Sequence, residues 1–485
     1  MEQKKTGFQK QLSPTHVWAI AFGCIIGWGA FINPGKKFLP NSGVDGTAIA
    51  MLLGALVMVI IAFAYAYMVP KYPKAGGEFN YTRSCFGKVP AYICGWFLLA
   101  AYLTNVPMNS TAIGLIVDGL DGSSDILQWG FHYSIAGFEV WLGEIILAMS
   151  ILILFGVLNI LGVKKASFVQ TVLASMLAGC VFILTIAAIF SDKTSFANME
   201  PIWGFDRFAA AAAGATTETI DSFAHVGRQG ILSAILATFA IAPWAFVGFE
   251  TIPQAAEEFK FSYKKVMVIM TIAIAFGCFV YVANNTVAAA ALTNWPDRVI
   301  AGEWVLLVAA EEMLGIVGKI LLGLAVSSAV LSGIMGFYLA SSRLMYSMSR
   351  DGYLPKMFSK IDERYGTPRN AMLFCIIISL SGPILGREAL GWFVDMSAIG
   401  ASIGFFFTCA STLVVMKRDK DGTPLLRIMA FLGVLFSITF VILQLIPIPG
   451  LNGVHFGNES YLMLLVWIVI GILFFSKQRK FIIEN

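Results

Sequence analysis

The stretch Gly23-Cys24-Ile25-Ile26-Gly27-Trp28-Gly29-Ala30-Phe31 interrupts an apolar run in which a membrane helix would otherwise be continuous. Glycine inside a helix costs about 1 kcal/mol relative to alanine, and this stretch carries three glycines. Backbone groups freed in hydrocarbon need new partners, so such a break is tolerated only where it faces protein, water or a ligand. A helix broken at mid-membrane offers a ligand amides on one side and carbonyls on the other. The stretch therefore predicts half of a substrate site.

A second interpretation of the same glycines stays open. Gly23 and Gly27 form a Gly-x-x-x-Gly pair, which in membrane helices is typical of close helix packing without a binding site. A second interrupted segment elsewhere in the chain would favour the substrate site, because transporters build their sites where two such segments meet.

The composition is that of an integral membrane protein. The 485 residues are 58% hydrophobic and 13% charged, whereas soluble domains carry about 25% charged residues. The seven cysteines show no spacing of a metal site or a disulfide framework, and no cofactor is expected. The N-terminus lacks a short apolar core with a small-residue cleavage site, so we expect no removable signal peptide.

Apolar windows long enough to cross about 30 Å of hydrocarbon recur twelve times. They lie near residues 14–35, 44–69, 89–120, 139–162, 165–190, 229–255, 264–289, 315–346, 370–386, 390–416, 425–446 and 461–476. Twenty-five of the 33 Lys and Arg residues fall on the side that holds both termini, which predicts that this side is cytoplasmic. The expected location is the plasma or inner membrane of the cell. The long outer loop should form a short surface helix at Ala209–Ala213, and Glu303–Met313 should form another over the outer face.

The sixth window contains a second break, Ile241-Ala242-Pro243-Trp244-Ala245-Phe246-Val247-Gly248-Phe249-Glu250. Pro243 removes a backbone donor and Gly248 loosens the next turn, although a proline in a membrane helix is also consistent with a simple kink. If the helices group as five, five and two, both breaks fall in the first helix of a five-helix unit. The predicted fold is therefore all-α with twelve transmembrane helices, a 5+5 inverted repeat and discontinuous helices 1 and 6. The expected units are residues 1–190, an outer loop at 191–228, the second repeat at 229–416, and the last two helices at 417–485.

Several motifs in order resemble the amino acid–polyamine–organocation superfamily of amino acid permeases. They are Gly23–Phe31, Pro73–Phe79, Pro243–Glu250 followed by Ala256-Glu257-Glu258, and Ser342–Tyr346 followed by Arg350–Pro355. Each motif is weak alone, but four in order over most of the chain are specific. The resemblance implies a secondary transporter that works by alternating access, with an amino acid bound between the two breaks.

The chemistry of an α-amino acid suggests how it would bind. Its carboxylate should favour the amides at Gly27, Trp28 and Gly29, and its ammonium the carbonyls near Ile25, Trp244 and Val247. The resemblance implies the same assignment and an aromatic gate at Trp244, whereas an ordinary core aromatic is the alternative. The predicted substrate-binding residues are Ile25, Ile26, Gly27, Trp28, Gly29, Trp244, Phe246, Val247, Gly248, Tyr102 and Asn105. Trp28 stands where the family usually has a small residue. Its large side chain would either shrink the pocket towards small substrates or simply face the sixth helix.

Two couplings are open. Glu250 has no cation at helical spacing in its own helix, and desolvation disfavours its charged form, so it could carry a proton during transport. The alternative is a glutamate that bonds the unwound backbone and never titrates. The lysine that replaces sodium in many family members is absent after Val163-Lys164, which leaves a sodium site at Ser327, Ser328 or Ser332, or uncoupled exchange. Such serines usually bond only the preceding turn of their own helix. Asp395 and Glu144 lie near outer helix ends, where we expect structural roles.

The leading function is a secondary active transporter for amino acids, by proton-coupled symport or exchange. The alternatives are a sodium-coupled amino acid symporter and a permease for a carboxylate-free amine such as ethanolamine or a polyamine. An enzyme is not expected, because His16, His132, His225 and His455 lie at helix ends or in loops. No phosphate-binding loop for ATP is present. The expected partners are an amino acid, H+ or Na+, and the lipid bilayer, with no nucleic acid.

Overall fold

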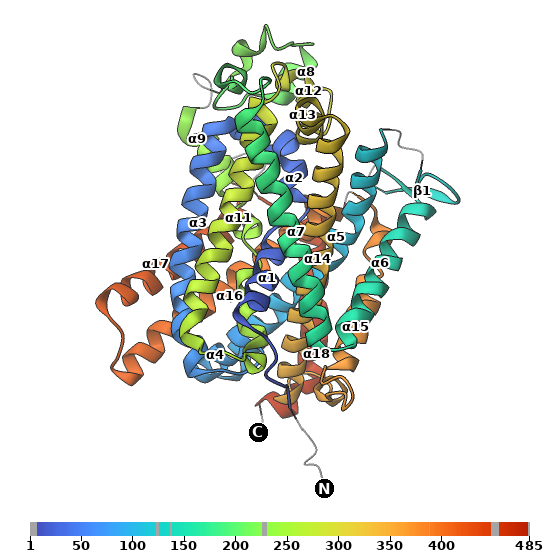
Figure 1. Cartoon of the computed structure of the whole chain (residues 1–485). Coiled ribbons are helices and arrows are strands. Elements are labelled where there is room, and N and C mark those ends of the chain that lie inside the picture. Colours follow the sequence, from blue (N-terminus) through green and yellow to red (C-terminus); the bar gives the residue numbers. More distant parts are fainter. Residues whose placement is uncertain are drawn as a thin grey trace.

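The computed structural model describes residues 7–122, 126–135, 138–225, 230–387, 389–447 and 455–483. Lys4, Lys5 and Arg228, which contribute to the orientation prediction, lie outside these residues, as does the end of the 191–228 loop. The described chain is a bundle of long helices with one small β-hairpin (Figure 1).

The long helices share a high content of apolar residues and make up the bundle. They are α3 (Leu39–Lys71), α5 (Lys88–Asp121), α6 (Leu142–Ile160), α7 (Val163–Phe190), α11 (Val266–Ala290), α14 (Ile316–Arg350), α16 (Ala389–Asp419), α17 (Pro424–Leu445) and α18 (Asn458–Ile483). Shorter helices complete it: α1 (Pro14–Ile25), α2 (Gly29–Asn33), the π-helix η1 (Pro34–Phe38), α4 (Gly77–Phe86), α9 (Gly230–Phe239), α10 (Ala242–Ala245), the 3₁₀ helix η4 (Phe249–Glu258) and α15 (Arg369–Ser379).

Nine helical stretches of the described chain are long and apolar enough to cross a membrane, or ten if the bent pair Gly230–Phe239 and Ala242–Glu258 forms one span. The chain is therefore a multi-pass membrane protein. The window expected at 370–386 does not form a single long helix. α15 ends at Ser379, and a turn at Ser381-Gly382 leads into the short 3₁₀ helix Pro383–Leu385, because Gly and Pro do not continue an α-helix.

The first two expected helices are joined differently from the sequence prediction. Residues 36–43 were expected to connect them, but the helical backbone continues from α2 through η1 into α3. The bend is concentrated at Gly43, whose φ of 66° is a conformation that glycine adopts without strain. A side chain there would also collide with the backbone of Ile202, whose carbonyl oxygen is 1.9 Å from an ideal Cβ position.

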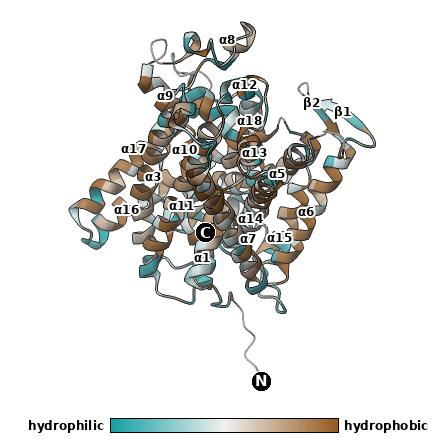
Figure 2. Ribbon diagram, turned by 45° about the horizontal axis from the view of Figure 1, so that its top comes forward, coloured by the Kyte–Doolittle hydropathy of each residue, from teal (hydrophilic) through white to brown (hydrophobic). Residues whose placement is uncertain are grey.

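The helices pack in matched pairs. α5 lies against α16 and α14 against α7; α3 lies against α9 and α11 against α1; α10 lies against α16 and α1 against α7. The most buried segments of the bundle are in α5, α14 and α16, whereas α17 and α18 are the least buried. Figure 2 shows hydrophobic residues along the outward-facing helices, as expected for surfaces that contact lipid.

The segment that leads into α1, the helix α4 and the end of α18 lie at one face of the bundle, which we call the N-terminal face (Figure 1). The opposite face carries the hairpin of β1 (His132–Ile135) and β2 (Phe138–Trp141), which the all-α expectation did not include. It also carries α8 (Arg207–Ala212), α12 (Trp295–Ile300) and α13 (Val305–Leu314). α8 and α13 confirm the short helices expected at Ala209–Ala213 and Glu303–Met313.

Candidate substrate site

The backbone of the first helix is interrupted where its glycines cluster. α1 ends at Ile25, Ile26 is extended with φ −99° and ψ 105°, and α2 begins at Gly29. Among the described residues, the amides of Gly27, Trp28 and Gly29 donate to no protein acceptor, and the carbonyl of Ile26 accepts no hydrogen bond. The interruption therefore presents donors and acceptors that a ligand can use.

The second interruption lies between α10 and η4. α10 ends at Ala245, and Gly248 has a φ of 143°, a conformation rarely adopted by residues with a side chain. The carbonyl of Val247 accepts no hydrogen bond among the described residues. The amide of Gly248 donates to Oε2 of Glu250 at 2.8 Å. The carboxyl of Glu250 therefore accepts a hydrogen bond from a backbone amide of the interruption.

The two interruptions touch, although they are far apart in the sequence. A Cβ on Gly248 would lie 2.5 Å from the backbone nitrogen of Ile25, and one on Gly29 would lie 2.2 Å from Cη2 of Trp244. The rings of Trp28 and Trp244 are 6.1 Å apart between centroids at an interplanar angle of 54°. Both tryptophans are 7% exposed. The free amides and carbonyls thus lie beside an aromatic pair inside the bundle.

The structure separates the two interpretations of the Gly23/Gly27 pair. A Cβ on Gly23 would lie 2.5 Å from Nε2 of Gln170 in α7 and 2.8 Å from Cβ of Ser332 in α14. Gly23 therefore allows close helix packing. Gly27 lies in the interruption, and its nearest neighbour is the side chain of Asn109, 3.0 Å from an ideal Cβ. One glycine of the pair serves packing and the other belongs to the broken backbone.

Glu250 is fully buried directly after the second break. Its Oε2 accepts from the Gly248 amide, and its Oε1 has no hydrogen-bond partner among the described residues. No ion pair within the described chain involves this carboxyl. A buried carboxyl without a cation is favoured in its neutral form.

Other predicted site residues lie close to the breaks but are engaged elsewhere. The hydroxyl of Tyr102 donates to the carbonyl of Glu250 at 3.2 Å, so this residue fastens α5 to η4. Nδ2 of Asn105 donates to Ala101 O at 2.7 Å and to Ser397 Oγ of α16 at 2.6 Å. The ring of Phe246 lies 6.1 Å from that of Tyr281. These contacts position the site, and nothing in them engages the free backbone amides.

Asn109 of α5 was missed by the sequence analysis. It is 1% exposed, its Nδ2 donates to Asn105 O at 2.9 Å, and its Oδ1 has no partner among the described residues. Its amide group lies between Gly27 and Gly333, since a Cβ on Gly333 would be 2.9 Å from Nδ2. Asn109 follows Asn105 by four residues, so the two share a helix face, and that polar face was the available signal. The hydroxyl of Tyr281 was missed too; it points to Ile25 O at 3.5 Å.

The three serines considered for sodium differ in position. Ser327 is half-buried, and Ser328 Oγ donates to Leu324 O of its own helix at 2.6 Å. Ser332 Oγ reaches Gly23 O at 3.3 Å and Ala329 O at 3.0 Å. Only Ser332 of the three is brought to α1. Beside it, Nε2 of Gln170 donates to Ala19 O at 3.1 Å.

The acids near the opposite face make polar contacts with other elements. Oε1 of Glu144 pairs with Nη2 of Arg387 at 2.6 Å, and the same guanidinium contacts Asp118. Asp395 accepts a hydrogen bond from Ser460 Oγ at 2.6 Å. These contacts join neighbouring elements of the bundle.

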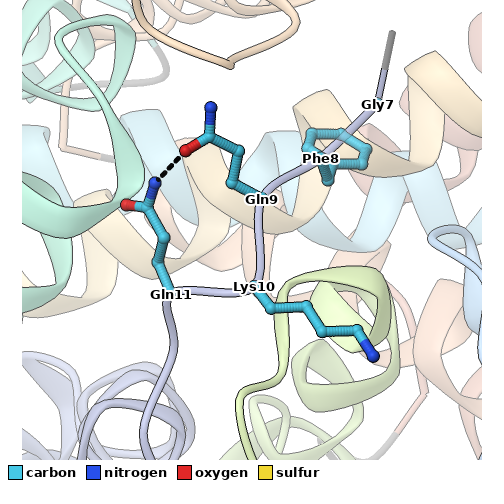
Figure 3. Close-up of a pocket in the computed structure, with 5 residues that line it drawn as sticks. All are labelled: Gly7, Phe8, Gln9, Lys10 and Gln11. Atoms are coloured by element: carbon cyan, nitrogen blue, oxygen red, sulfur yellow. Dashed lines mark hydrogen bonds between the residues drawn. The ribbon is translucent and has the colours of Figure 1, made fainter. Parts of the chain in front are cut away.

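Ion pairs and the N-terminal segment close the N-terminal face. Nε of Arg343 lies 2.6 Å from Oε1 of Glu258, and both side chains are 1% exposed. The amides of Gln11 and Leu12 both donate to Glu258 O at 2.9 Å, and Arg343 lies over the ring of Phe8 at 5.6 Å. Figure 3 shows this segment from Gly7 to Gln11, with Gln11 bonded to Gln9. A path from the breaks to this face would require these contacts to separate.

A bundle of long apolar helices, in which two interrupted helical segments touch, defines a multi-pass membrane protein. A family model described as amino acid permease matches residues 12–474. The chain belongs to the amino acid permease family.

Individual relatives differ in their named substrates. Cationic amino acid transporter 2, vacuolar, of Arabidopsis thaliana is 25% identical over 430 residues, covering 86% of this chain and 61% of the relative. The human large neutral amino acids transporter small subunit 2 is 27% identical over 374 residues, covering 77% of this chain and 64% of the relative. The methylthioribose transporter of Bacillus subtilis (strain 168) is 23% identical over 503 aligned residues, covering 100% and 96%. The chain thus spans less than two thirds of the length of the first two relatives.

Proposed function

We propose that this protein is a secondary transporter that moves amino acids across a cell membrane by alternating access. The observation that carries the proposal is the contact between the two helix breaks. It brings three free amides, two free carbonyls and two tryptophan rings to one buried place. A zwitterion with an anionic and a cationic group on neighbouring atoms matches this set of groups.

The substrate carboxylate binds the amides of Gly27, Trp28 and Gly29, and the ammonium binds the carbonyls of Ile26 and Val247. Trp244 covers the bound substrate and acts as the gate on one side. Trp28 faces Trp244, so its bulk leaves less room between the breaks and favours substrates with small side chains. Neutral amino acids fit this arrangement best, because the described residues around the breaks offer no cation or anion for a charged side chain except Glu250.

We propose that the coupling ion is a proton carried by Glu250. Support comes from its burial and its unpartnered Oε1 beside the break. Sodium at Ser332 is the weaker candidate, because Ser332 and Gln170 already donate hydrogen bonds to the carbonyls of Gly23 and Ala19. Each of these oxygens therefore already uses part of its acceptor capacity within the protein. Uncoupled exchange is distinguished from proton coupling by the experiment below.

The proposed architecture has twelve spans in two inverted five-helix repeats, at residues 1–190 and 229–416, followed by two helices in 417–485. The packing of the helices supports it. In this architecture α3, α5 and α7 of the first repeat correspond to α11, α14 and α16 of the second, and α1 corresponds to α9. The contact of α5 with α16 then has its counterpart in the contact of α14 with α7, and the contact of α3 with α9 has its counterpart in the contact of α11 with α1. Inverted repeats place the two broken helices around one site at mid-membrane. The N-terminal face is the cytoplasmic one in this proposal, since most Lys and Arg residues are on its side.

A permease for a substrate without a carboxylate is the second candidate. The full-length similarity to a protein named as a methylthioribose transporter favours keeping it, because methylthioribose is not an amino acid. Such a substrate would leave the amides at Gly27 to Gly29 without their anion. Ethanolamine and polyamines belong to the same alternative, as amines that lack the carboxylate.

The test is uptake by the purified full chain in proteoliposomes, with empty liposomes as control. A panel of radiolabelled amino acids, ethanolamine, putrescine and methylthioribose is offered with a proton gradient, a sodium gradient or neither. We expect small neutral amino acids to accumulate only with the proton gradient. Uptake of the amines or of methylthioribose without uptake of any amino acid would overturn the carboxylate assignment.

Replacing Asn109 by leucine is expected to raise the KM for the amino acid about tenfold or more, with little effect on stability. The leucine is of similar size, but it removes the unpartnered Oδ1 that a substrate ammonium can reach, and hydrogen bonds to charged groups contribute about 1.5–3 kcal/mol. Initial rates of uptake over a range of substrate concentrations measure the effect. Asn159→Leu is the matched control: Asn159 is also buried and bonds its own helix through Nδ2, but it lies in α6. An unchanged KM for Asn109→Leu would remove Asn109 from the site.

A further inference from the structure

A second carboxyl without a cation is buried near Glu250. Glu78 follows Gly76-Gly77 in the motif Pro73–Phe79, to which the proposed function gives no role. It lies in α4, outside the membrane-spanning segments and at the N-terminal face, and it is 0% exposed. Gly77 allows η4 to approach closely, since a Cβ there would lie 2.7 Å from Cβ of Pro253.

Hydrogen bonds link Glu78 to Glu250. The hydroxyl of Tyr65 in α3 donates to Oε1 of Glu78 at 2.8 Å, and Nε2 of Gln254 in η4 donates to Oε2 at 2.7 Å. Nε2 of Gln254 also lies 3.5 Å from the hydroxyl of Tyr102, which donates to the carbonyl of Glu250. The side chains of Gln254 and Tyr102 therefore connect the carboxyl of Glu78 to the backbone carbonyl of Glu250.

Three arginines around Glu78 are ion-paired with other acids. Arg83 pairs with Asp351, Arg343 with Glu258 and Arg350 with Glu257, and no described ion pair includes Glu78. The titratable groups that face Glu78 from the elements around it would add only negative charge when ionised. They are Tyr65 of α3, Tyr81 of α4, Cys94 and Tyr102 of α5, and Glu250 of η4; α14 and α16 contribute no charged group to this set.

Burial sets the protonation of Glu78. Desolvation raises the pKa of Glu78 to about 8, against the opposing effect of the Tyr65 and Gln254 hydrogen bonds. The folded protein therefore holds this carboxyl neutral at neutral pH, and the proton leaves as the pH rises through about 8. Because a negative charge on Glu250 also disfavours ionisation of Glu78, the two carboxyls do not readily ionise together.

We propose that Glu78 is a second proton-carrying carboxyl of the transport cycle, coupled to Glu250 across Gln254 and Tyr102. The inference rests on the proposed proton-coupled function and deepens it. When one carboxyl binds a proton, the repulsion that raised the proton affinity of the other is removed. A proton taken up at Glu250 beside the substrate is thereby linked to the protonation of a carboxyl at the N-terminal face, where protons are released to water once the face opens.

The experiment compares Glu78→Gln with the unaltered protein in proteoliposomes. An amide matches the neutral carboxyl in shape but carries no proton. We expect accumulation driven by a proton gradient to be lost and exchange between labelled and unlabelled amino acid to be kept. We expect exchange by the unaltered protein to decline as Glu78 loses its proton above pH about 8, and we expect this decline to be absent in the variant. Glu257→Gln is the control, because Glu257 lies in the same region but is ion-paired with Arg350.

A second variant tests the inference if Glu78→Gln does not fold. Tyr65→Phe removes the hydroxyl that stabilises the charged carboxylate, so the pKa of Glu78 should rise further and the pH profile of exchange should move to higher pH. Infrared spectra of the purified protein give a readout that does not depend on transport: a protonated-carboxyl band that titrates near pH 8 should be absent in Glu78→Gln.

The outcomes separate this inference from the proposed function. Normal gradient-driven accumulation by Glu78→Gln, or an unchanged pH profile in Tyr65→Phe, would overturn the role of Glu78 while leaving amino acid transport intact. Absence of amino acid uptake by the unaltered protein would instead overturn the proposed function, and the infrared titration would still report whether Glu78 holds a proton.

Discussion

Gly248→Ala is expected to abolish transport. The new Cβ would lie 2.5 Å from the backbone nitrogen of Ile25 and 2.7 Å from the carbonyl carbon of Cys24, and backbone atoms cannot move aside as a flexible side chain can. The φ of 143° adds strain of about 1–3 kcal/mol, and overpacking adds about 1–3 kcal/mol more. The two broken helices would be forced apart, and the free amides and carbonyls would no longer face one substrate. Initial rates of uptake and thermal unfolding in detergent measure the two effects.

Gly179→Ala is the matched control for Gly248→Ala. Gly179 lies in α7, and no atom lies within 4 Å of an ideal Cβ there. Alanine in a helix interior is favoured over glycine by about 0.5–1 kcal/mol, so this variant should transport normally and unfold at the same or a higher temperature. If Gly248→Ala retained normal uptake and stability, the close contact between the two breaks could not be required for transport.

Glu250→Gln is expected to abolish accumulation against a gradient while leaving exchange. The glutamine oxygen can still accept from the Gly248 amide, so the break keeps its geometry, but the side chain no longer binds a proton. In a proton-coupled transporter a gradient of one pH unit supplies about 1.4 kcal/mol, enough for about tenfold accumulation. The variant should show none of this accumulation. Gradient-driven uptake and counterflow, measured in the same proteoliposomes, separate the two activities.

Glu257→Gln serves as control for this variant as well, because it removes a carboxyl of η4 that is ion-paired and partly exposed. It should accumulate substrate as the unaltered protein does. If accumulation is driven by a sodium gradient and is retained in Glu250→Gln, the ion-coupling site is instead at the contact of α1 with α14 near Ser332. Loss of both exchange and accumulation in a folded Glu250→Gln would indicate a structural role for the carboxyl.

The features that depend on local sequence could be predicted from it. Apolar windows gave the helices, because burial in lipid requires long apolar stretches, and each window holds helix in the structure. The glycines at 23–29 and the Pro243–Gly248 segment marked where the helical backbone is interrupted, because these residues weaken or block helical hydrogen bonds wherever they stand. The motifs in order indicated the amino acid permease family. The connection expected between the first two helices, at residues 36–43, was wrong, because the π-helix η1 carries the helical backbone into α3 and the chain departs from helical geometry at Gly43.

Tertiary structure decided which residues meet. Local spacing could not distinguish Gly23, which packs against Gln170 and Ser332, from Gly27, which faces Asn109, because the difference lies in what other helices bring to each position. For the same reason, the sequence did not reveal that Asn109 lies beside Gly27 with an unpartnered Oδ1, or that Asn105 is hydrogen-bonded to Ser397 instead of contacting the free amides. It also hid the link between Glu78 and Glu250, whose bridge through Gln254 joins α4 to η4. The sequence determined where apolar helices form, where glycine and proline weaken them, and the family, because these depend on local composition; the packing of helices distant in the chain decided which polar groups have no protein partner among the described residues.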